Sequence, residues 1–493
     1  MTSSANESTP FTNGSTRPDS PQAASPGDPS AHQASLRFLY DRINYEGAPS
    51  QGANYPFRLR RMRDLIRRLG LEAYLASDSS SSTPPPKPLV HIAGTKGKGS
   101  TASMVAAMLS AAGYRTGLYT SPHLTALEER FRIDSLPCRQ VDLVQLVDRI
   151  RSVATAMDCD SELAPTFFEL TTAIAVLHFH LQSCDAIVLE TGLGGRLDST
   201  NVFASSVTAI TSIGLDHQHV LGNTIAEIAS EKAGIMKPSV PVVSAVSRPE
   251  AVQTVHRKAA GMDLPLFQYG RDFDCDATPR PDWGSQFQYR GRTPPLRPNH
   301  QAPLALEGDH QANNAAVAVA IVDLLNAQGL PVSNDAVSRG LGNLTCEARI
   351  ERFTLRQDVV AILDAAHNPD SIDALVQTLK PRLATRPITV VFATSRDKDA
   401  QTMLDWLSPL ATHLILTRYV GNPRYREPSK LRAMVDESRI GKSGLESITV
   451  LEDPIEACEV GLAKATPGGA VVICGSFFLA AETRSWLQGK SKS

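Results

Sequence analysis

Short apolar runs alternate with longer helix-like segments along most of this chain. The first run, "PLVHIAG", is soon followed by "STASMVAAMLSAAG", which begins with Ser and Thr, continues with an apolar helical pattern and stops at Gly113. Further apolar runs lie at 186–189, 207–213 and 241–246, and helical patterns lie at 166–181 and 224–233. Such alternation predicts an α/β fold with a doubly wound, mainly parallel sheet.

A second alternating series begins after residue 345. Its strand-like runs are "DVVAILD", "ITVVFAT", "HLILTR", "SITVLE" and "GAVVICG". We therefore expect one α/β domain over 36–345 and a smaller, Rossmann-like α/β domain over 346–493. Between 266 and 304 the pattern breaks into sequence rich in Pro, Arg and aromatic residues, for which we predict irregular structure or short antiparallel strands.

The start of the chain has a different composition. Residues 1–35 are dominated by Ser, Thr, Pro, Gly, Asn and Ala, which cannot bury enough apolar area to offset their ordering entropy, so we predict a disordered tail. In "FRLRRMRDLIRRLG" (57–70), one helical face collects the apolar side chains and six arginines surround it. We interpret this segment as a docked helix with a solvated basic face; the alternative is an anion-binding surface.

Composition and charge exclude several classes of protein. With 493 residues, of which 42% are hydrophobic, the chain can bury a large core. Its 49 basic and 51 acidic side chains nearly cancel, so no global field attracts nucleic acid or an anionic membrane. The seven cysteines lack metal-finger spacing, and the sequence shows neither a signal-peptide pattern nor an apolar stretch long enough to span a bilayer. We expect a cytoplasmic protein with neither nucleic-acid nor membrane partners.

The stretch "HIAGTKGKGST" (91–101) lies between the first predicted strand and the helix after it. Its glycines let backbone N–H groups converge on phosphate oxygens, and the helix N-terminus adds partial positive charge. Lys98 is then predicted to reach the β- and γ-phosphates of a nucleotide. The stretch departs from G-x-x-x-x-G-K-[ST], because Ile92 stands where the first glycine belongs and Gly99 follows the lysine. A flexible turn is the alternative, which the flanking strand and helix disfavour.

Six motifs, in order, resemble the folylpolyglutamate synthase/dihydrofolate synthase branch of the Mur ligase superfamily. They are "HIAGTKGKGST", "TSPHL", "ETGLGGRLDSTN", "LDHQHVLGNTIAEIASEKAGIMKP", "EGDHQANNA" and "DAAHNPDS". The resemblance implies an ATP-dependent amide ligase that joins L-glutamate to dihydropteroate, to a (tetrahydro)folyl-polyglutamate, or to both. Of these we expect the bifunctional form, which has both activities. The reaction passes through an acyl phosphate and releases ADP and phosphate. ATP, Mg²⁺ and these small-molecule substrates are the implied partners, and we expect a monomer.

The resemblance also implies residues that hold two Mg²⁺ ions. Ser121, Glu190 and His217 match the family's metal ligands. His217 is the least expected of the three, because Mg²⁺ prefers oxygen, and by itself it would be a hydrogen-bonding loop residue. Lys232 matches a lysine that the family carbamylates into a ligand for the second metal, although alone it would be a solvated surface lysine. Lys237, five residues later, we interpret as a helix-end charge.

The nucleotide-binding residues implied by the motifs come from both predicted domains. The loop supplies Gly94, Thr95, Lys96, Gly97, Lys98, Gly99, Ser100 and Thr101, with Lys96 either a second phosphate contact or an exposed charge. Asn314 is matched to an ATP contact, although Asn313 beside it leaves the assignment open, and Arg349 is matched to an arginine at the phosphates. Asp364 is implied to bind the ribose, and His367 to act at the nucleotide or the incoming glutamate. Lys98, Lys232 and His367 are the predicted catalytic residues.

Three further residues are matched to the substrate side of the site. His123 and Arg130 resemble a loop that closes over the folate, with a surface salt bridge as the alternative for Arg130. Glu169, in "FFEL", is placed at a helix N-terminus or near a metal. A Mur-type ligase of peptidoglycan precursors is the alternative function, but such enzymes usually carry an N-terminal domain before the phosphate loop. A nucleotide-switched binding module is a third alternative.

Overall fold

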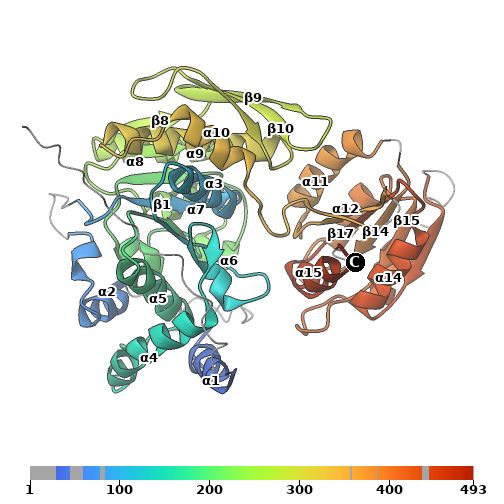
Figure 1. Ribbon diagram of the computed structural model, residues 1–493, viewed down its shortest axis with the longest axis horizontal. Coiled ribbons are helices and arrows are strands. Elements are labelled where there is room, and N and C mark those ends of the chain that lie inside the picture. The colour runs from blue at the N-terminus through green and yellow to red at the C-terminus, as the bar shows by residue number, and fades with distance from the viewer. Residues whose placement is uncertain are drawn as a thin grey trace, which may run out of the picture.

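The computed structural model describes residues 29–44, 59–77, 84–160, 162–355, 358–384, 386–435 and 444–491. The first half of the molecule lies at the left in Figure 1. It is built on an eight-stranded sheet with the order β4-β3-β2-β5-β1-β6-β7-β8. The strands are β1 (Leu89–Ala93), β2 (Thr116–Tyr119), β3 (Phe131–Ile133), β4 (Leu136–Pro137), β5 (Ala186–Glu190), β6 (Val207–Ile210), β7 (Val242–Ser244) and β8 (Leu266–Gln268). All neighbours from β2 to β8 are parallel, so the predicted fold class is confirmed.

Helices cover both faces of this sheet, which explains why its strands are almost continuously apolar. One face packs against α3 (Lys98–Ala111), α9 (Asp309–Ala327) and α10 (Asn334–Gly342). The other face packs against α2 (Leu59–Arg68), α4 (Gln140–Met157) and α5 (Phe167–Leu181). Near β7 lie α6 (Gln218–Leu221), α7 (Ile225–Ala233) and α8 (Pro249–Gly261). All five residues of β1 are buried, so the loop that follows it starts from a fixed point.

The N-terminal part of the chain is more ordered than its composition predicted. Residues 1–28 of the predicted tail lie outside the described residues, but 29–35 belong to α1 (Pro29–Tyr40), so disorder is wrong for them. The helix packs on α4 and α5 and buries Ser35 and Leu39. Tertiary packing therefore stabilises a segment whose local composition is unfavourable.

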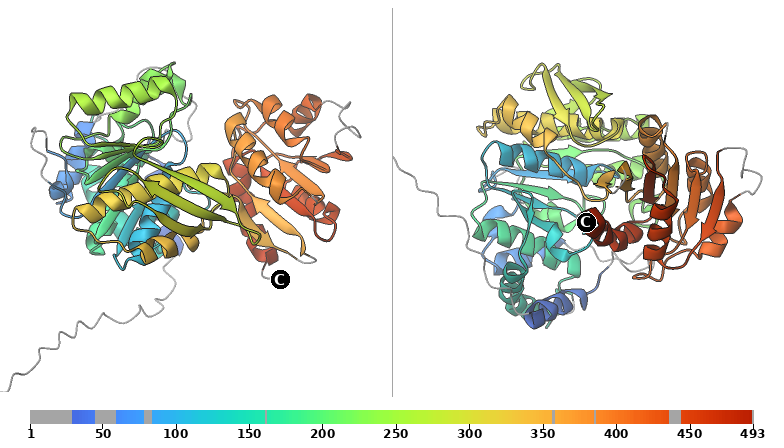
Figure 2. Two further views of the ribbon diagram at one scale, coloured as in Figure 1. Left: turned by 90° about the horizontal axis from the view of Figure 1, so that it is seen from above. Right: turned by 45° about the vertical axis from the view of Figure 1, so that its right-hand side comes forward.

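The irregular region is a separate antiparallel sheet of three strands, which was one of the two predicted possibilities. It consists of β9 (Phe273–Pro279), β10 (Ser285–Gly291) and β11 (His300–Leu304). Figure 2 (left) shows the β9–β10 hairpin reaching from the larger half of the molecule to the C-terminal half.

The tip of this hairpin joins the two halves. Trp283 packs on the hydrophobic core of the C-terminal half, with Arg352 5.0 Å and Arg382 5.5 Å from its ring. The buried carboxylate of Glu307 lies 3.1 Å from Arg352 and 3.0 Å from Arg382. It also accepts a hydrogen bond from the backbone N–H of Gly284. Aromatic packing and a paired buried charge therefore hold the same contact.

The C-terminal half contains a six-stranded sheet with the order β12-β13-β17-β14-β15-β16. Its strands are β12 (Glu351–Thr354), β13 (Val360–Leu363), β14 (Ile388–Phe392), β15 (His413–Leu416), β16 (Ser447–Val450) and β17 (Ala470–Cys474). Only β12 pairs antiparallel, so the second predicted α/β series is confirmed. The helices around it are α11 (Pro369–Arg382), α12 (Ala400–Leu407), α13 (Pro428–Met434), α14 (Pro454–Lys464) and α15 (Phe477–Ser491). Within the described ranges, no helix is both long and apolar enough to cross a membrane.

Candidate active site

The loop between β1 and α3 has the conformation of a phosphate site. Gly97 is the N-cap of α3 with a φ of 85°, and a Cβ there would lie 2.3 Å from Asn314 Oδ1, so only glycine fits. The hydroxyls of Thr211 and Ser212, just after β6, donate to the carbonyl oxygen of Lys96 at 2.7 and 3.0 Å. The loop is thus held rigidly ahead of the first N–H groups of α3, which suits the binding of an anion.

The two lysines of the loop point to different partners. Lys98 is the first residue of α3, and its Nζ lies 3.9 Å from Glu190 Oε1. Lys96 reaches the C-terminal half, where its Nζ donates to Asn368 Oδ1 at 3.1 Å and lies 3.3 Å from Asp370 Oδ2. Lys96 therefore links the two halves, an arrangement that neither of its predicted roles included.

Glu190 places a buried carboxylate beside the loop. It ends β5, and its Oε2 accepts a hydrogen bond of 3.2 Å from the backbone N–H of Ser121. A Cβ on Gly99 would lie 3.3 Å from the same oxygen. Burial raises the pKa of the Glu190 carboxyl, and the positive charge of Lys98 offsets part of that rise. A carboxylate with so few partners is suited to a cation in the space next to the loop.

Lys232 comes to the same loop from α7. Its side chain is buried, and its Nζ donates to the carbonyl oxygen of Gly94 at 3.0 Å. Burial, followed by the charge of Lys98, lowers the pKa of Lys232 to about 7. The solvated surface lysine considered from sequence is therefore wrong. His217 is the N-cap of α6, with a φ of 48°, and its half-exposed side chain lies near its neighbour Asp216.

The C-terminal half presents the "DAAHNPDS" segment to this loop. Asp364 follows β13, and its buried carboxylate accepts from the backbone N–H groups of Ile350 and Ala366, each at 2.8 Å. Burial raises the pKa of Asp364, and the charge of Arg349 opposes the rise. His367 lies in the turn before α11, with its Nδ1 2.9 Å from the carbonyl oxygen of Ala365.

Two further nucleotide-binding candidates lie near the junction. Asn314, on α9, lies against Gly97, and its Nδ2 donates to Gln311 Oε1 at 3.1 Å. Asn313 instead accepts a hydrogen bond of 2.7 Å from the Tyr269 hydroxyl. The structure thus distinguishes the neighbouring asparagines, and Asn314 is the one at the loop. Arg349 has an electrostatic influence on both Glu190 and Asp364, which belong to different halves.

Comparison with known proteins agrees with this geometry. The Mur ligase middle domain matches residues 92–322, and the Mur ligase glutamate ligase domain matches 348–477. The dihydrofolate synthase/folylpolyglutamate synthase of Bacillus subtilis is 33% identical over 93% of this chain and 99% of its own. The chain belongs to the folylpolyglutamate synthase/dihydrofolate synthase family of Mur ligases.

Two solved structures have the same fold. The folylpolyglutamate synthase of Mycobacterium tuberculosis in complex with ADP has a TM-score of 0.78 and 29% identity, covering 93% of this chain and 98% of its own. An FPGS complex with AMPPCP and folate has a TM-score of 0.74 and 28% identity, covering 92% of this chain and 99% of its own. Both coverages extend over the two halves, so the whole architecture is shared.

Two of the predicted substrate residues, His123 and Arg130, lie in a cluster beside α1. Arg130 Nε donates to His123 Nδ1 at 2.9 Å, and its guanidinium lies 5.2 Å from the Phe167 ring. Tyr40, at the end of α1, stacks on Phe167 at 5.2 Å and its hydroxyl lies 3.3 Å from His123 Nε2. Burial and the charge of Arg130 lower the pKa of His123 to about 3, so the ring is neutral. Sequence analysis missed Tyr40, because α1, which ends at this residue, was not predicted.

Glu169 lies in the same region but has structural partners. The Thr166 side chain accepts from its backbone N–H, and the Glu169 carboxylate accepts from the N–H of Thr166, which forms a capping box at the start of α5. Arg61 Nε also donates to both carboxylate oxygens at 2.8 and 2.7 Å, and both side chains are buried. The predicted helix N-terminus is confirmed, and a contact of Glu169 with substrate stays a prediction. The burial of Arg61 was not predicted from sequence. Its spacing of four residues from Leu65 was the available signal, because it places both residues on one helix face.

Replacing Arg61 with methionine is expected to lower the free energy of unfolding by about 3–5 kcal/mol, because Glu169 is left buried and unpaired. Chemical denaturation followed by circular dichroism measures the loss. Arg67→Met on the exposed face of the same helix is the control, with an expected change within about 0.5 kcal/mol. Equal losses in the two variants would contradict the buried pair.

Proposed function

We propose that this protein catalyses the ATP-dependent ligation of L-glutamate to dihydropteroate, to folyl-polyglutamates, or to both. The observation that carries the proposal is the set of contacts made by the β1–α3 loop. Its Lys98 lies beside Glu190, its Gly94 carbonyl accepts from Lys232, and its Lys96 donates to Asn368 in the segment that follows Asp364. The fold is shared with an ADP complex and with an AMPPCP–folate complex, which supports ATP and a folate as substrates. We place the boundary between the ATP-binding and C-terminal domains at 345/346.

The reaction begins with activation of a carboxylate. The carboxylate oxygen of the pterin substrate attacks the γ-phosphorus of ATP, the bond to the β,γ-bridging oxygen breaks, and ADP leaves with that electron pair. Lys98 neutralises charge on the transferred phosphoryl group. The amine of L-glutamate then attacks the acyl carbon, the tetrahedral intermediate expels phosphate, and the amine loses its proton. We assign His367 a role at the nucleotide or at the incoming glutamate.

The binding roles follow the positions of the residues. Gly94, Thr95, Lys96, Gly97, Gly99, Ser100 and Thr101 hold the phosphates together with Lys98, while Asn314, Arg349 and Asp364 complete the nucleotide site. His123, Arg130 and Glu169 line the substrate side. The protein works as a monomer in the cytoplasm on small-molecule substrates.

The residues beside the loop fit Mg²⁺. Glu190 offers a buried carboxylate with few hydrogen-bond partners beside Ser121, and the half-exposed His217 feels the charges of Lys232 and Lys98. Mg²⁺ prefers oxygen ligands, which the Glu190 carboxylate and the Ser121 hydroxyl would offer. Ser121, Glu190 and His217 would hold one ion, and carbamylated Lys232 a second. Bound Mg²⁺ would supply positive charge to the phosphates.

Phosphate release tests the function and its alternatives. With ATP and L-glutamate present, we expect release to depend on dihydropteroate or on tetrahydrofolate, and the two substrates tested separately show which activity the enzyme has. A uridine-linked muropeptide should give none, because the relative that matches 93% of this chain is a dihydrofolate synthase/folylpolyglutamate synthase. Release that depends on the muropeptide, or on none of these acceptors, would contradict the proposal.

A further inference from the structure

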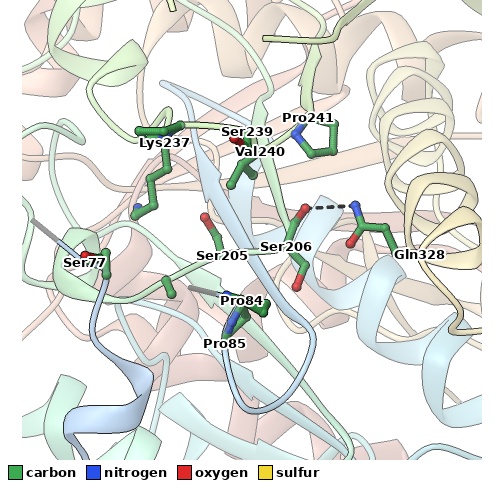
Figure 3. Close-up of a pocket in the computed structure, with 13 residues that line it drawn as sticks. Ser77, Pro84, Pro85, Ser205, Ser206, Lys237, Ser239, Val240, Pro241 and Gln328 are labelled. Carbon is green, nitrogen blue, oxygen red and sulfur yellow. Dashed lines mark hydrogen bonds between the residues drawn. The ribbon is translucent and has the colours of Figure 1, made fainter. Parts of the chain in front are cut away.

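A cavity lies at the edge of the eight-stranded sheet opposite the β1–α3 loop. Figure 3 shows residues that line it. Its volume is about 310 Å³. Its walls are segments that precede β1, β6 and β7, whereas the candidate active site is built where strands end. Gln328, after α9, closes one wall by donating to the carbonyl oxygen of Ser206 at 3.1 Å. The cavity is therefore separate from the site for ATP and folate.

Lys237 brings a buried charge to this cavity. Its side chain is 8% exposed, and its Nζ donates to Asn201 Oδ1 at 2.9 Å and to the carbonyl oxygen of Ile235 at 3.3 Å. Both partners are neutral, and the described residues include no carboxylate paired with this lysine. Burial and the positive charge of Arg63 lower the pKa of Lys237 to about 7. A buried ammonium that has no carboxylate partner among the described residues is costly, and an anion beside it would remove that cost.

Ser205 supplies a second donor from the opposite wall. It is 4% exposed, and its hydroxyl has no hydrogen-bond partner within the described structure. Figure 3 shows the side chains of Ser205 and Lys237 pointing toward the same space. The ammonium has three N–H donors and uses two of them on Asn201 and Ile235. Two donors that face one cavity indicate a ligand rich in acceptor oxygens.

The same lysine is connected to the helix that carries Lys232. Asn201 Nδ2 donates to the carbonyl oxygens of Arg196 and Gly234 at 3.0 and 3.1 Å. A Cβ on Gly234 would lie 2.3 Å from Arg196 Cβ, so these two segments are in backbone contact just after α7. Whatever holds Lys237 against Asn201 therefore also holds the end of α7.

We infer that this cavity binds a small dianionic oxyanion, inorganic phosphate or a compact phosphate monoester, through Lys237 and Ser205. An anion would meet the positive charge of Lys237, and the several oxygens of a phosphate can accept from both Lys237 and Ser205. The bound anion stabilises the contact between Asn201 and the end of α7, and so the position of Lys232. Phosphate binding in this cavity does not require the proposed ligase reaction, because the cavity lies at the other edge of the sheet.

Calorimetric titration with inorganic phosphate tests the site in a Lys98→Ala background, in which the β1–α3 loop is weakened. We expect binding that Lys237→Met weakens by about ten- to a hundredfold and Ser205→Ala weakens by a smaller factor. Lys258→Met, at a half-buried lysine of α8, is the matched control and should leave the affinity unchanged. Phosphate affinity that is the same with and without Lys237 would overturn the proposal. If Lys237→Met does not fold, Ser205→Ala decides the result.

Other ligands define the chemistry. Tighter binding of glycerol phosphate than of inorganic phosphate would assign the cavity to an ester, and equal binding would assign it to phosphate itself. Acetate that binds as well as phosphate would overturn the proposal of a dianionic ligand.

Hydrogen exchange measures the coupling between the cavity and Lys232. Phosphate should slow exchange at residues 231–236 in the Lys98→Ala protein and not in Lys98→Ala/Lys237→Met. Equal exchange in both would refute the coupling to Lys232.

Discussion

Replacing Lys98 with alanine is expected to lower kcat by a factor on the order of 10²–10³ while the fold persists. The reason is positional, because Lys98 opens α3 beside the phosphate loop and its Nζ is 3.9 Å from the buried carboxylate of Glu190. We expect a charge at that point to act on the transferred phosphoryl group, whose negative charge must be neutralised as it moves. Steady-state glutamate ligation with saturating ATP measures the loss.

The fold of this variant is checked in the same experiment. Lys98 has no contact in the hydrophobic core, so its thermal unfolding should stay close to that of the unaltered protein. Lys258→Ala on α8 is a matched control for removing one partly buried lysine and should keep full activity. Near-normal turnover by Lys98→Ala would remove Lys98 from the reaction.

Lys232 is expected to carry a carbamate when the enzyme is kept in ¹³C-bicarbonate at about pH 8. Carbamate formation requires a neutral amine, and a lysine with a pKa of about 7 is about half neutral near pH 7. An ordinary lysine is neutral in fewer than about one molecule in a thousand at that pH. Carbon NMR should show a carbamate carbonyl whose intensity falls as the pH drops from 8 to 6, because the amine becomes protonated. The modified side chain is an anion beside the loop, so Lys232→Met should reduce kcat by a factor on the order of 10².

Lys237 provides the decisive control for that signal. Its pKa is also lowered to about 7, but its amine bonds to Asn201 and lies away from the phosphate loop. The signal should vanish in Lys232→Met and remain in Lys237→Met. A signal that survives in Lys232→Met, or one that is absent from the unaltered protein, would show that Lys232 is not the modified residue.

The parallel sheets could be predicted from sequence because their strands are buried on both faces. Runs such as "GAVVICG" carry that information locally, and β17 (Ala470–Cys474) is buried throughout. The phosphate loop could be predicted equally well, because its glycines and the following helix are contiguous in the chain. Local pattern was sufficient wherever the determining contacts are close in sequence.

Contacts between distant segments could not be predicted in this way. Arg61 was assigned to a solvated face because its partner Glu169 lies more than a hundred residues later. Lys96 was ambiguous because the oxygen atoms it meets, on Asn368 and Asp370, belong to the other half of the chain. Helix α1 was missed for the same reason, as its stability comes from α4 and α5.

The joint at Trp283 limits how this enzyme can be rearranged by recombination. A crossover near residue 345 would separate the hairpin tip and Glu307 from Arg352 and Arg382, which they need in order to pair. A C-terminal half taken from a relative with other side chains at those two positions would leave a buried carboxylate uncompensated. Viable chimeras would have to take the hairpin and the C-terminal half from the same parent protein. The hairpin and this half are therefore expected to be inherited together.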